Sequence, residues 1–308
     1  MITLYVNFDT ASMSAWMGQA GSLAPNLQAF LIAFFLIGFS VKMAIFPLHI
    51  WLPDAHTVAP MPVTIILAAA MLSMGTYGIL RFPFALFPMA RLQPFALWMM
   101  IGGLASEVYG ALMSLAERDV KRIIAYSSVS QMGYILFGLG TLTLRGMEGA
   151  IMHVVYHAIV KALLFMVVGI IIHITQQRDI HQIGGLGFKY PGLAVAAAIG
   201  VLGISGMPPL GIFNSEWMIF AGGFDSGISN VVTVLTLIGS LLTVVYALRF
   251  FGGIFFGKKQ PADLPPKAPL ALVLPTIAVT IFLIVEGLTP RPLLNWAERG
   301  LALIFGSL

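Results

Sequence analysis

Three residues that bind protons recur at every fourth position of one apolar stretch of the sequence. They are His153, His157 and Lys161, and the stretch runs from about Ile151 to Ile174. At about 100° per residue, these positions wind slowly around one face of a helix. Histidine titrates near neutral pH, and a lysine that leaves water gives up its proton more readily. The spacing therefore predicts a single-file relay for protons across a membrane.

The composition predicts the surroundings of that stretch. Of the 308 residues, 59% are hydrophobic and 9% are charged, whereas an ordinary soluble domain is about 25% charged. We therefore expect an all-α, multi-pass protein of the cell membrane, with lipid around its spans. The net charge of +4 is small and the lysines and arginines are scattered, which indicates no nucleic-acid partner.

The residue types also limit the cofactors. The sequence has no cysteine, so it cannot hold a thiolate-bound iron–sulfur cluster, a c-type haem or a disulfide. His153 and His157 could share a metal ion, but no third ligand is evident. Both project from one side of one helix, so they cannot clasp a haem between them. We expect no cofactor and no bound metal, with electron transfer taking place on other subunits.

Eight segments contain about the twenty apolar residues that a helix needs to cross a bilayer. Their predicted ranges are 24–44, 60–80, 93–116, 120–140, 148–174, 191–221, 228–256 and 268–288. We expect 1–23 to be an N-terminal loop segment, 24–288 a transmembrane antiporter-like domain and 289–308 an amphipathic C-terminal tail. Lysine and arginine are more frequent in the loops after the third, fifth and seventh spans, which predicts an N-terminus outside the cell.

Two of the predicted spans are broken within the membrane. Pro47 and Pro53 interrupt one, and Pro208 and Pro209 interrupt the other, because proline removes helical hydrogen bonds. Backbone that leaves the helix at this depth has to lie inside protein or beside a water-filled cavity. Paired broken spans are typical of transporters built from inverted repeats.

Three further ionisable residues, Lys42, Glu107 and Glu216, fall within predicted spans, where a charge costs about 2.5–3.5 kcal/mol. Lys42 and Glu216 each lie beside a break and could extend the relay, although Lys42 could instead snorkel to the interface. Glu107 either belongs to the relay or pairs with a lysine of the next span. His153 could also be a core histidine bonded to a carbonyl. The charged run 117–122 is predicted to be an interfacial loop cluster that anchors helix ends.

Five motifs occur in an order that is typical of one family. The first is Phe46-Pro47-Leu48-His49-Ile50-Trp51-Leu52-Pro53-Asp54-Ala55-His56 and the second includes Ser127-Ser128-Val129-Ser130-Gln131-Met132-Gly133. The other three are the ladder with Ala162-Leu163-Leu164-Phe165, Gly184-Gly185-Leu186, and Pro208-Pro209 followed by Glu216-Trp217. The sequence resembles the antiporter-like membrane subunits of respiratory complex I, of multi-subunit cation/proton antiporters and of membrane-bound hydrogenase-type complexes. This resemblance implies an inverted-repeat transporter fold and a part in proton transfer for Lys42, Lys161 and Glu216.

The sequence departs from that family in three ways. Members have about fourteen spans, and this sequence is similar only to the last eight or so, which implies either a separate chain for the first spans or a reduced form. Ser73 stands where the family usually has a central lysine, and a serine cannot store a proton at neutral pH. Gln131 stands where some members have histidine.

Together these features predict an ion-translocating membrane subunit of a redox-driven, multi-subunit oxidoreductase complex. Protons, or alternatively sodium ions, would step along Lys42, the ladder of His153, His157 and Lys161, and Glu216. The expected partners are other membrane subunits, including further antiporter-like ones, and a peripheral iron–sulfur redox module. The alternatives are a non-conducting scaffold between that module and a complete antiporter subunit, and a sodium/proton antiporter subunit.

Overall fold

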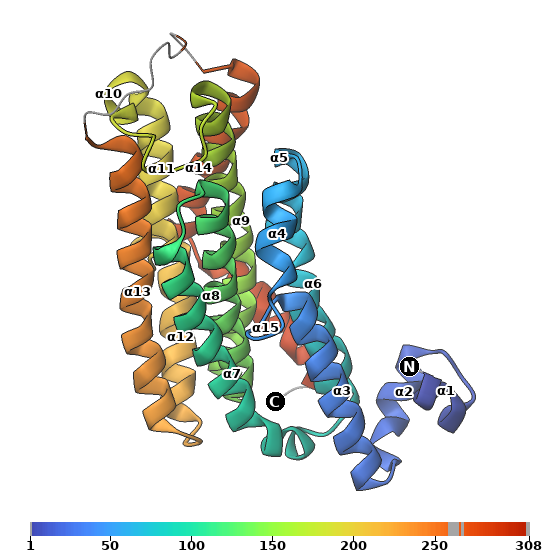
Figure 1. Ribbon diagram of the computed structural model, residues 1–308. Coiled ribbons are helices and arrows are strands. Elements are labelled where there is room, and N and C mark those ends of the chain that lie inside the picture. Colours follow the sequence, from blue (N-terminus) through green and yellow to red (C-terminus); the bar gives the residue numbers. More distant parts are fainter. Residues whose placement is uncertain (1, 258–264, 266–267, 306–308) are drawn as a thin grey trace.

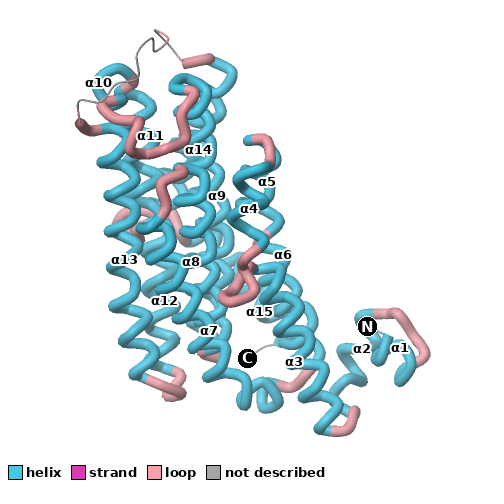
Figure 2. The backbone as a smooth tube through the Cα atoms, in the orientation of Figure 1, coloured by secondary structure: helices cyan, strands magenta, loops and turns pink. Residues whose placement is uncertain are grey.

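The computed structural model describes residues 2–257, 265 and 268–305, and these consist of helices joined by short loops (Figures 1 and 2). The predicted all-α membrane fold is confirmed. Within the described part, seven helical segments are long and apolar enough to cross a membrane. They are α3 (Pro25–Met43), the continuous segment Met61–Phe84, which contains α5 (Met61–Ile66) and α6 (Ser73–Ile79), α7 (Met89–Ala116), α8 (Val120–Gly140), α9 (Leu144–Thr175), α13 (Asn230–Phe255) and α14 (Leu270–Leu288). The predicted remaining span is divided into α11 (Pro191–Ile204) and α12 (Gly211–Asp225).

Both predicted breaks are present. α3 ends because Ala44 takes the left-handed conformation, with φ of 57°, and the chain resumes as α4 (Trp51–Val58). The second break separates α11 from α12 and passes through Gly206, whose φ is 62°. A positive φ costs glycine little, whereas most other residues pay about 1 kcal/mol or more for it.

Polar side chains fix where the two central helices begin. The Asp119 carboxylate accepts hydrogen bonds from the backbone N–H groups of Lys121 and Arg122 at the start of α8. The Thr143 hydroxyl accepts one from the Gly146 N–H at the start of α9. Such caps satisfy backbone donors that have no partner within the helix. They set the register in which α8 and α9 present their side chains to each other.

α8 is the axis of the bundle, because its whole length is buried by its neighbours. It packs against α7, α9 and α12, while α13 and α14 are mostly exposed and form the outer surface. Glycines let α7 and α8 approach closely: a Cβ atom added at Gly133 would lie 2.5 Å from the carbonyl oxygen of Gly103. Small residues at such contacts are the usual means by which helices associate in lipid.

α9 joins two arms of the fold. Figure 1 shows α3 to α6 on one side of it and α11 to α14 on the other, and segments from both arms contact it. The short helix α10 (Leu186–Lys189) precedes α11, and the predicted amphipathic tail contains α15 (Arg291–Phe305), which also packs against α9. The ladder is therefore carried by the helix that connects the arms.

The N-terminal segment differs from the prediction. The sequence from 1 to 23 was expected to form a loop, but it contains α1 (Ile2–Phe8) and α2 (Met13–Gln19) (Figure 1). Leu4 and Trp16 are buried, and the Trp16 indole N–H donates to the Thr10 carbonyl at 2.8 Å. The glycine- and serine-rich composition of this segment indicated a loop, because it does not show that Leu4 and Trp16 are buried.

The second span departs from regular α-helix in a way that the sequence did not predict. It contains two π-helical turns, Leu67–Met71 and Leu80–Phe84. The first ends two residues before Ser73, whose hydroxyl donates to the Ala69 carbonyl within that turn at 3.1 Å. π-helical turns are rare and frequently mark functional sites. The residue that replaces the family's lysine thus follows an irregular turn.

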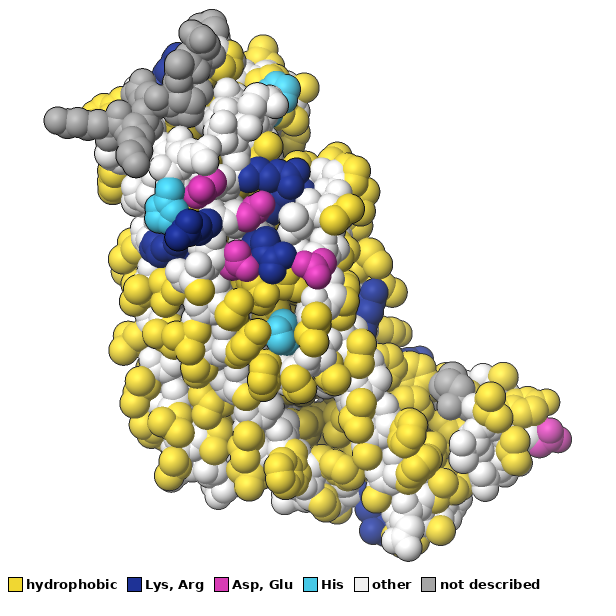
Figure 3. Space-filling model, in the orientation of Figure 1, with side chains coloured by type: hydrophobic (Ala, Val, Ile, Leu, Met, Phe, Trp, Pro, Cys, Tyr) yellow, Lys and Arg dark blue, Asp and Glu magenta, His cyan; other side chains and the backbone are white. Residues whose placement is uncertain are grey.

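Charged side chains gather toward one end of the face shown in Figure 3, over the loops that flank α8 and follow α9. Arg122 pairs with Asp54 at 2.8 Å and with Glu117 at 2.9 Å. The backbones of Arg118 and Arg178 bond to that of the facing loop, through Val120 N to Arg178 O and Ile180 N to Arg118 O, each at 2.9 Å. The run 117–122 therefore joins α4, the loop before α8 and the loop after α9 at this end, in agreement with the prediction of an anchoring cluster.

Candidate functional site

The three ladder residues lie on α9 and are completely buried. The exposed fraction of His153, His157 and Lys161 is 0%. The two imidazole rings stack with their centroids 6.5 Å apart and their planes inclined by 14°. The spacing of four residues therefore does place these groups on one face of the helix, and that face meets α8.

The Lys161 ammonium is held by neutral oxygen atoms of α8. Its Nζ donates to the Ile124 carbonyl at 3.0 Å and, in a shorter contact, to the Ser127 hydroxyl. Among the residues that the structure describes, no carboxylate lies within ion-pair distance of it. A buried charge without a counter-charge is costly. This cost favours the transfer of the Lys161 proton to another group.

His153 connects α9 with two other helices. Its Nε2 lies 3.1 Å from the Gln131 Oε1 of α8, and its Nδ1 lies 3.1 Å from the Ser215 hydroxyl of α12. The Gln131 oxygen accepts in either case. The Ser215 hydroxyl can accept from a charged ring while it donates to the Ile212 carbonyl at 2.8 Å, or it can turn its one proton toward a neutral ring. This pair of partners serves both protonation states of His153. Because Gln131 Oε1 is a carbonyl oxygen, these contacts also agree with the alternative of a core histidine bonded to a neighbouring carbonyl.

His157 lies between the other two ladder residues, and neither of its ring nitrogens has a hydrogen-bond partner among the described residues. Buried polar atoms nearly always bond to protein or to ordered water. Buried water typically bonds to groups that are otherwise unsatisfied. The two ring nitrogens of His157 are therefore suited to form hydrogen bonds with water molecules that lie between His153 and Lys161.

The second break packs against Glu216. Glu216 is buried on α12, next in sequence to Ser215, which contacts His153. A Cβ atom at Gly206 would lie 2.2 Å from the Glu216 Oε2, so the broken segment lies directly against the carboxyl group. Glu216 Oε1 has no partner in the described part of the chain. The carboxyl thus has one oxygen atom available for a proton, although Ser215 and not Glu216 contacts the ladder.

Lys42 does not join this buried row. It lies in the last turn of α3 and is half-buried, and no hydrogen bond or ion pair of its side chain occurs within the described residues. The described residues therefore show no side-chain contact that joins Lys42 to the ladder, and the predicted path between them would have to pass through water. The physical reason is that α3 is mostly exposed in the fold, so its lysine is not enclosed.

Glu107 is buried on α7 but has no lysine partner. Its exposed fraction is 0%, and neither of its oxygen atoms is hydrogen-bonded to a described residue. The lysine of the next span, Lys121, donates instead to the Ala59 carbonyl at 2.8 Å. Pairing between Glu107 and that lysine, one of the two alternatives for this residue, is not observed.

Two residues near the ends of spans are more deeply buried than the sequence predicted. Lys121 was expected in the interfacial cluster, yet it is 2% exposed, because α4 covers the start of α8. His56, predicted only to lie near a span end, is fully buried and stacks on Phe165 at a centroid distance of 4.9 Å. The apolar neighbours of His56 gave no signal in the sequence, because they come from a distant helix.

The sequence also did not identify the partners of the ladder as site residues. Ser127, Gln131 and Ser215 are all fully buried, and each contacts Lys161 or His153. A signal was present in α8, where hydroxyl and amide side chains recur within a span. Polar residues in lipid-spanning helices usually face other helices, so this recurrence could have indicated the face toward α9.

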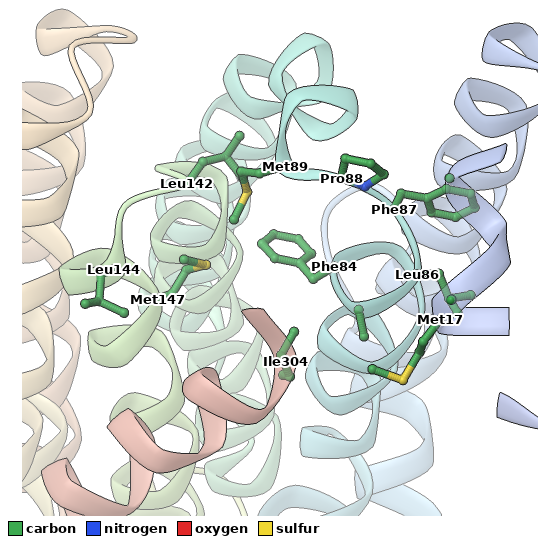
Figure 4. Close-up of a pocket in the computed structure, with 13 residues that line it drawn as sticks. Met17, Phe84, Leu86, Phe87, Pro88, Met89, Leu142, Leu144, Met147 and Ile304 are labelled. Atoms are coloured by element: carbon green, nitrogen blue, oxygen red, sulfur yellow. The ribbon is translucent and has the colours of Figure 1, made fainter. Parts of the chain in front are cut away.

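Other features of the molecule lie outside the row. Within the described residues, no three His, Cys, Asp or Glu side chains gather in a metal-binding group. A cavity of about 620 Å³ opens between α2, the end of the second span and α15. Figure 4 shows its lining of apolar side chains, among them Met17, Phe84, Met147 and Ile304. It contains no residue of the ladder and offers no path for protons.

Two broken spans that flank a buried row of lysine, histidine and glutamate define the class of antiporter-like membrane subunits. The family described as NADH:quinone oxidoreductase/Mrp antiporter, transmembrane, matches residues 1–243. The chain belongs to this family, as the motifs predicted.

Curated relatives share this similarity over most of the chain. NADH-quinone oxidoreductase subunit M of Escherichia coli (strain K12) is 33% identical over 284 residues, which cover 91% of this chain and 55% of the relative. NAD(P)H-quinone oxidoreductase chain 4 2 of Synechococcus sp. (strain JA-3-3Ab) is 37% identical over 240 residues, or 76% of this chain and 45% of the relative. The chain therefore spans about half the length of these relatives.

Solved structures show the same fold. A chain of the Mrp complex from Dietzia sp. DQ12-45-1b matches with a TM-score of 0.89 and 24% identity, over 98% of this chain and 64% of that chain. A chain of the archaeal membrane-bound sulfane sulfur reductase matches with a TM-score of 0.85 and 28% identity, over 92% and 49%. A chain of respiratory complex I from Thermus thermophilus matches with a TM-score of 0.85 and 24% identity, over 99% and 65%.

Proposed function

We propose that this chain translocates protons as a membrane subunit of a redox-driven, multi-subunit oxidoreductase complex. The observation that carries the proposal is the enclosed row of Lys161, His157, His153 and Glu216, in which only neutral groups contact the lysine. Ionisable residues in lipid-spanning helices are rare and usually mark an ion pathway. The printed names of the relatives, which are NADH- and NAD(P)H-quinone oxidoreductases, support the redox setting.

The proposed transfer starts at Lys161. Its ammonium passes a proton to His157, through water bonded to the unpartnered ring nitrogens, and His157 passes one to His153. From His153 the proton reaches the Glu216 carboxyl by way of the Ser215 hydroxyl or water beside it. The transfer requires each donor and acceptor to lie within hydrogen-bond reach, directly or through one water molecule.

A change of charge on a neighbouring subunit would drive the transfer. A unit charge about 15 Å away, at an effective dielectric constant of about 20, changes the free energy of a buried proton by about 1 kcal/mol. This corresponds to a factor of about five in the occupancy of Lys161. Several such changes along the row would be needed to move one proton from Lys161 to Glu216. The proposal therefore requires neighbouring subunits that change charge or shape together.

The proposed partners follow from the surface of the fold. Because α3 is mostly exposed, we propose that further membrane helices cover its exposed side. These helices would enclose Lys42, which would then lead into the row. Further antiporter-like subunits and a peripheral iron–sulfur redox module would complete the complex in the cell membrane.

The charged end shown in Figure 3 sets the proposed orientation. The loops beside α8 and after α9 carry Arg118, Arg122 and Arg178 at this end. Excess lysine and arginine in short loops favours the cytoplasmic side. We therefore propose that this end faces the cytoplasm, which places the N-terminus on the outside.

A non-conducting scaffold is the second candidate, and one observation favours it. Ser73 replaces the family's central lysine, and its hydroxyl is bonded to the Ala69 carbonyl. A sodium/proton antiporter subunit is supported less, because the Asp54 carboxylate, which could serve as a sodium ligand, is exposed and paired with Arg122 at 2.8 Å.

The test is a pair of lysine variants in the native complex. Inverted membrane vesicles are energised with NADH, reduced ferredoxin or hydrogen, whichever sustains electron transfer in the wild type, and acidification is followed with a pH-sensitive dye. We expect Lys161→Ala to abolish pumping and to spare electron transfer, while the exposed control Lys189→Ala pumps as the wild type does. Undiminished pumping by Lys161→Ala would refute the proposal, and pumping that requires added sodium would support the antiporter alternative instead.

A further inference from the structure

The row described above leaves one buried carboxyl group without a role. Glu107 of α7 is fully enclosed, and both of its oxygen atoms lack hydrogen-bond partners among the described residues. It points at α13, where a Cβ atom added at Gly239 would lie 2.4 Å from its Oε1. α13 therefore carries a glycine at the position where any larger residue would displace this carboxyl group.

Buried hydroxyl groups lead away from Glu107 along α8 and α13. Tyr134 follows Gly133, which packs against the backbone of Glu107, and the Tyr134 hydroxyl lies 3.4 Å from the Thr243 hydroxyl. Tyr246 lies one helical turn further along α13, which packs against α8, the helix that carries Ser127. All of these side chains are 0–2% exposed, so the row of hydroxyls is enclosed by protein.

This second row begins at the same lysine as the first. Ser127, at its near end, accepts a hydrogen bond from the Lys161 ammonium. The Tyr246 hydroxyl has no hydrogen-bond partner in the part of the chain described. Hydroxyl groups both donate and accept, so a row of them can pass a proton from one end to the other.

We infer that Glu107 is a second proton acceptor for Lys161, reached through the row of Ser127, Tyr246, Thr243 and Tyr134. The inference rests on the proposed function, and it adds a side branch to the relay, distinct from the branch that ends at Glu216. The branch gives Lys161 two carboxyl groups that can receive its proton, one on α12 and one on α7.

The proton balance of the branch is simple. The Ser127 hydroxyl donates to the Ile124 carbonyl at 2.9 Å, so it has to rotate toward Tyr246 before it can pass its proton on. It then takes a proton from Lys161 Nζ as it gives its own to Tyr246, directly or through water, and each following hydroxyl does the same. The last proton adds to the Glu107 carboxylate. The net change converts an ammonium and a carboxylate into an amine and a carboxylic acid, with no other reactant.

Electrostatics favours this exchange. An ammonium and a carboxylate buried apart from each other each bear the cost of leaving water, which is several kcal/mol per ion. They recover little of that cost by attraction, because they are not in contact. Transfer of one proton removes both charges at once. The branch would therefore store a proton on Glu107 whenever Lys161 is charged and Glu216 is already occupied.

The test uses infrared difference spectroscopy on the chain in its native complex, in lipid. Protons are released from a caged compound by a laser flash, and the carboxylic-acid C=O band is followed in time. We expect a band that Glu107→Gln removes and Glu216→Gln leaves in place. Tyr246→Phe should slow its appearance by at least about tenfold, as loss of a proton-transferring group does.

Tyr156→Phe is the matched control, because Tyr156 is also buried with an unpartnered hydroxyl but faces Gly211 of α12. Gly239→Ala is a second test that changes no titratable group, and it should shift or weaken the band by displacing the carboxyl group. A spectrum of Glu107→Gln identical to that of the wild type, or equal rates in Tyr246→Phe and Tyr156→Phe, would overturn the branch. Either result alongside loss of pumping in Lys161→Ala would leave the main relay standing, whereas normal pumping in Lys161→Ala would remove the relay itself.

Discussion

Substitution of Gly133 by alanine tests the contact that positions the site. A Cβ atom there would lie 2.5 Å from the Gly103 carbonyl oxygen and 2.7 Å from the backbone nitrogen of Glu107. Both neighbours are backbone atoms of α7, so the two helices would have to separate. Gly102→Ala is the matched control on α7, because its added Cβ would meet only the end of the Leu136 side chain, at 3.6 Å.

The two variants differ in free energy of unfolding by the cost of overpacking alone. Alanine in place of glycine within a helix stabilises by about 0.8–1 kcal/mol in both, whereas overpacking costs about 1–3 kcal/mol. We expect Gly102→Ala to be slightly more stable than the wild type and Gly133→Ala to be less stable than that control by about 1–3 kcal/mol. Thermal unfolding in detergent, followed by light scattering and tryptophan fluorescence, measures the difference. If Gly133→Ala melts at the same temperature as Gly102→Ala, the inference that α7 and α8 are in close backbone contact at Gly133 is wrong.

Three further substitutions test the site and its surroundings. Gly206→Ala should destabilise the chain by about 1–2 kcal/mol through its positive φ, and should reduce pumping by displacing the Glu216 carboxyl; thermal unfolding and vesicle acidification measure these effects. Gln131→Leu should destabilise by about 1–3 kcal/mol because His153 loses a buried partner, whereas Gln131→Asn should retain more pumping. Arg122→Ala should cost less than about 1 kcal/mol and leave pumping unchanged, and a larger effect would mean that its ion pairs do more than join loops.

Much of the fold could be predicted because it follows from local sequence. Apolar length defines the spans, and proline defines the two breaks. The ladder could be predicted because residues four apart share a helix face whatever surrounds them. The helices of the N-terminal segment could not, since Leu4 and Trp16 stabilise them through contacts that composition does not reveal.

The site was predicted in part, for the same physical reason. The sequence identified Lys161 and Glu216 but not that Ser127 and Gln131 hold the ladder, because those contacts join helices that are distant in the chain. It could not place Lys42, because the exposure of a helix depends on which elements cover it, and in this chain α3 is mostly uncovered.

The central claim is that the enclosed row on α9 carries protons through water. The most direct measurement is a cryo-electron microscopy map of the intact complex in lipid, at a resolution that shows ordered water. We expect water density bonded to both ring nitrogens of His157 and continuing toward Lys161 and Glu216. Apolar atoms packed against those nitrogens, with no water density between His153 and Lys161, would contradict the account.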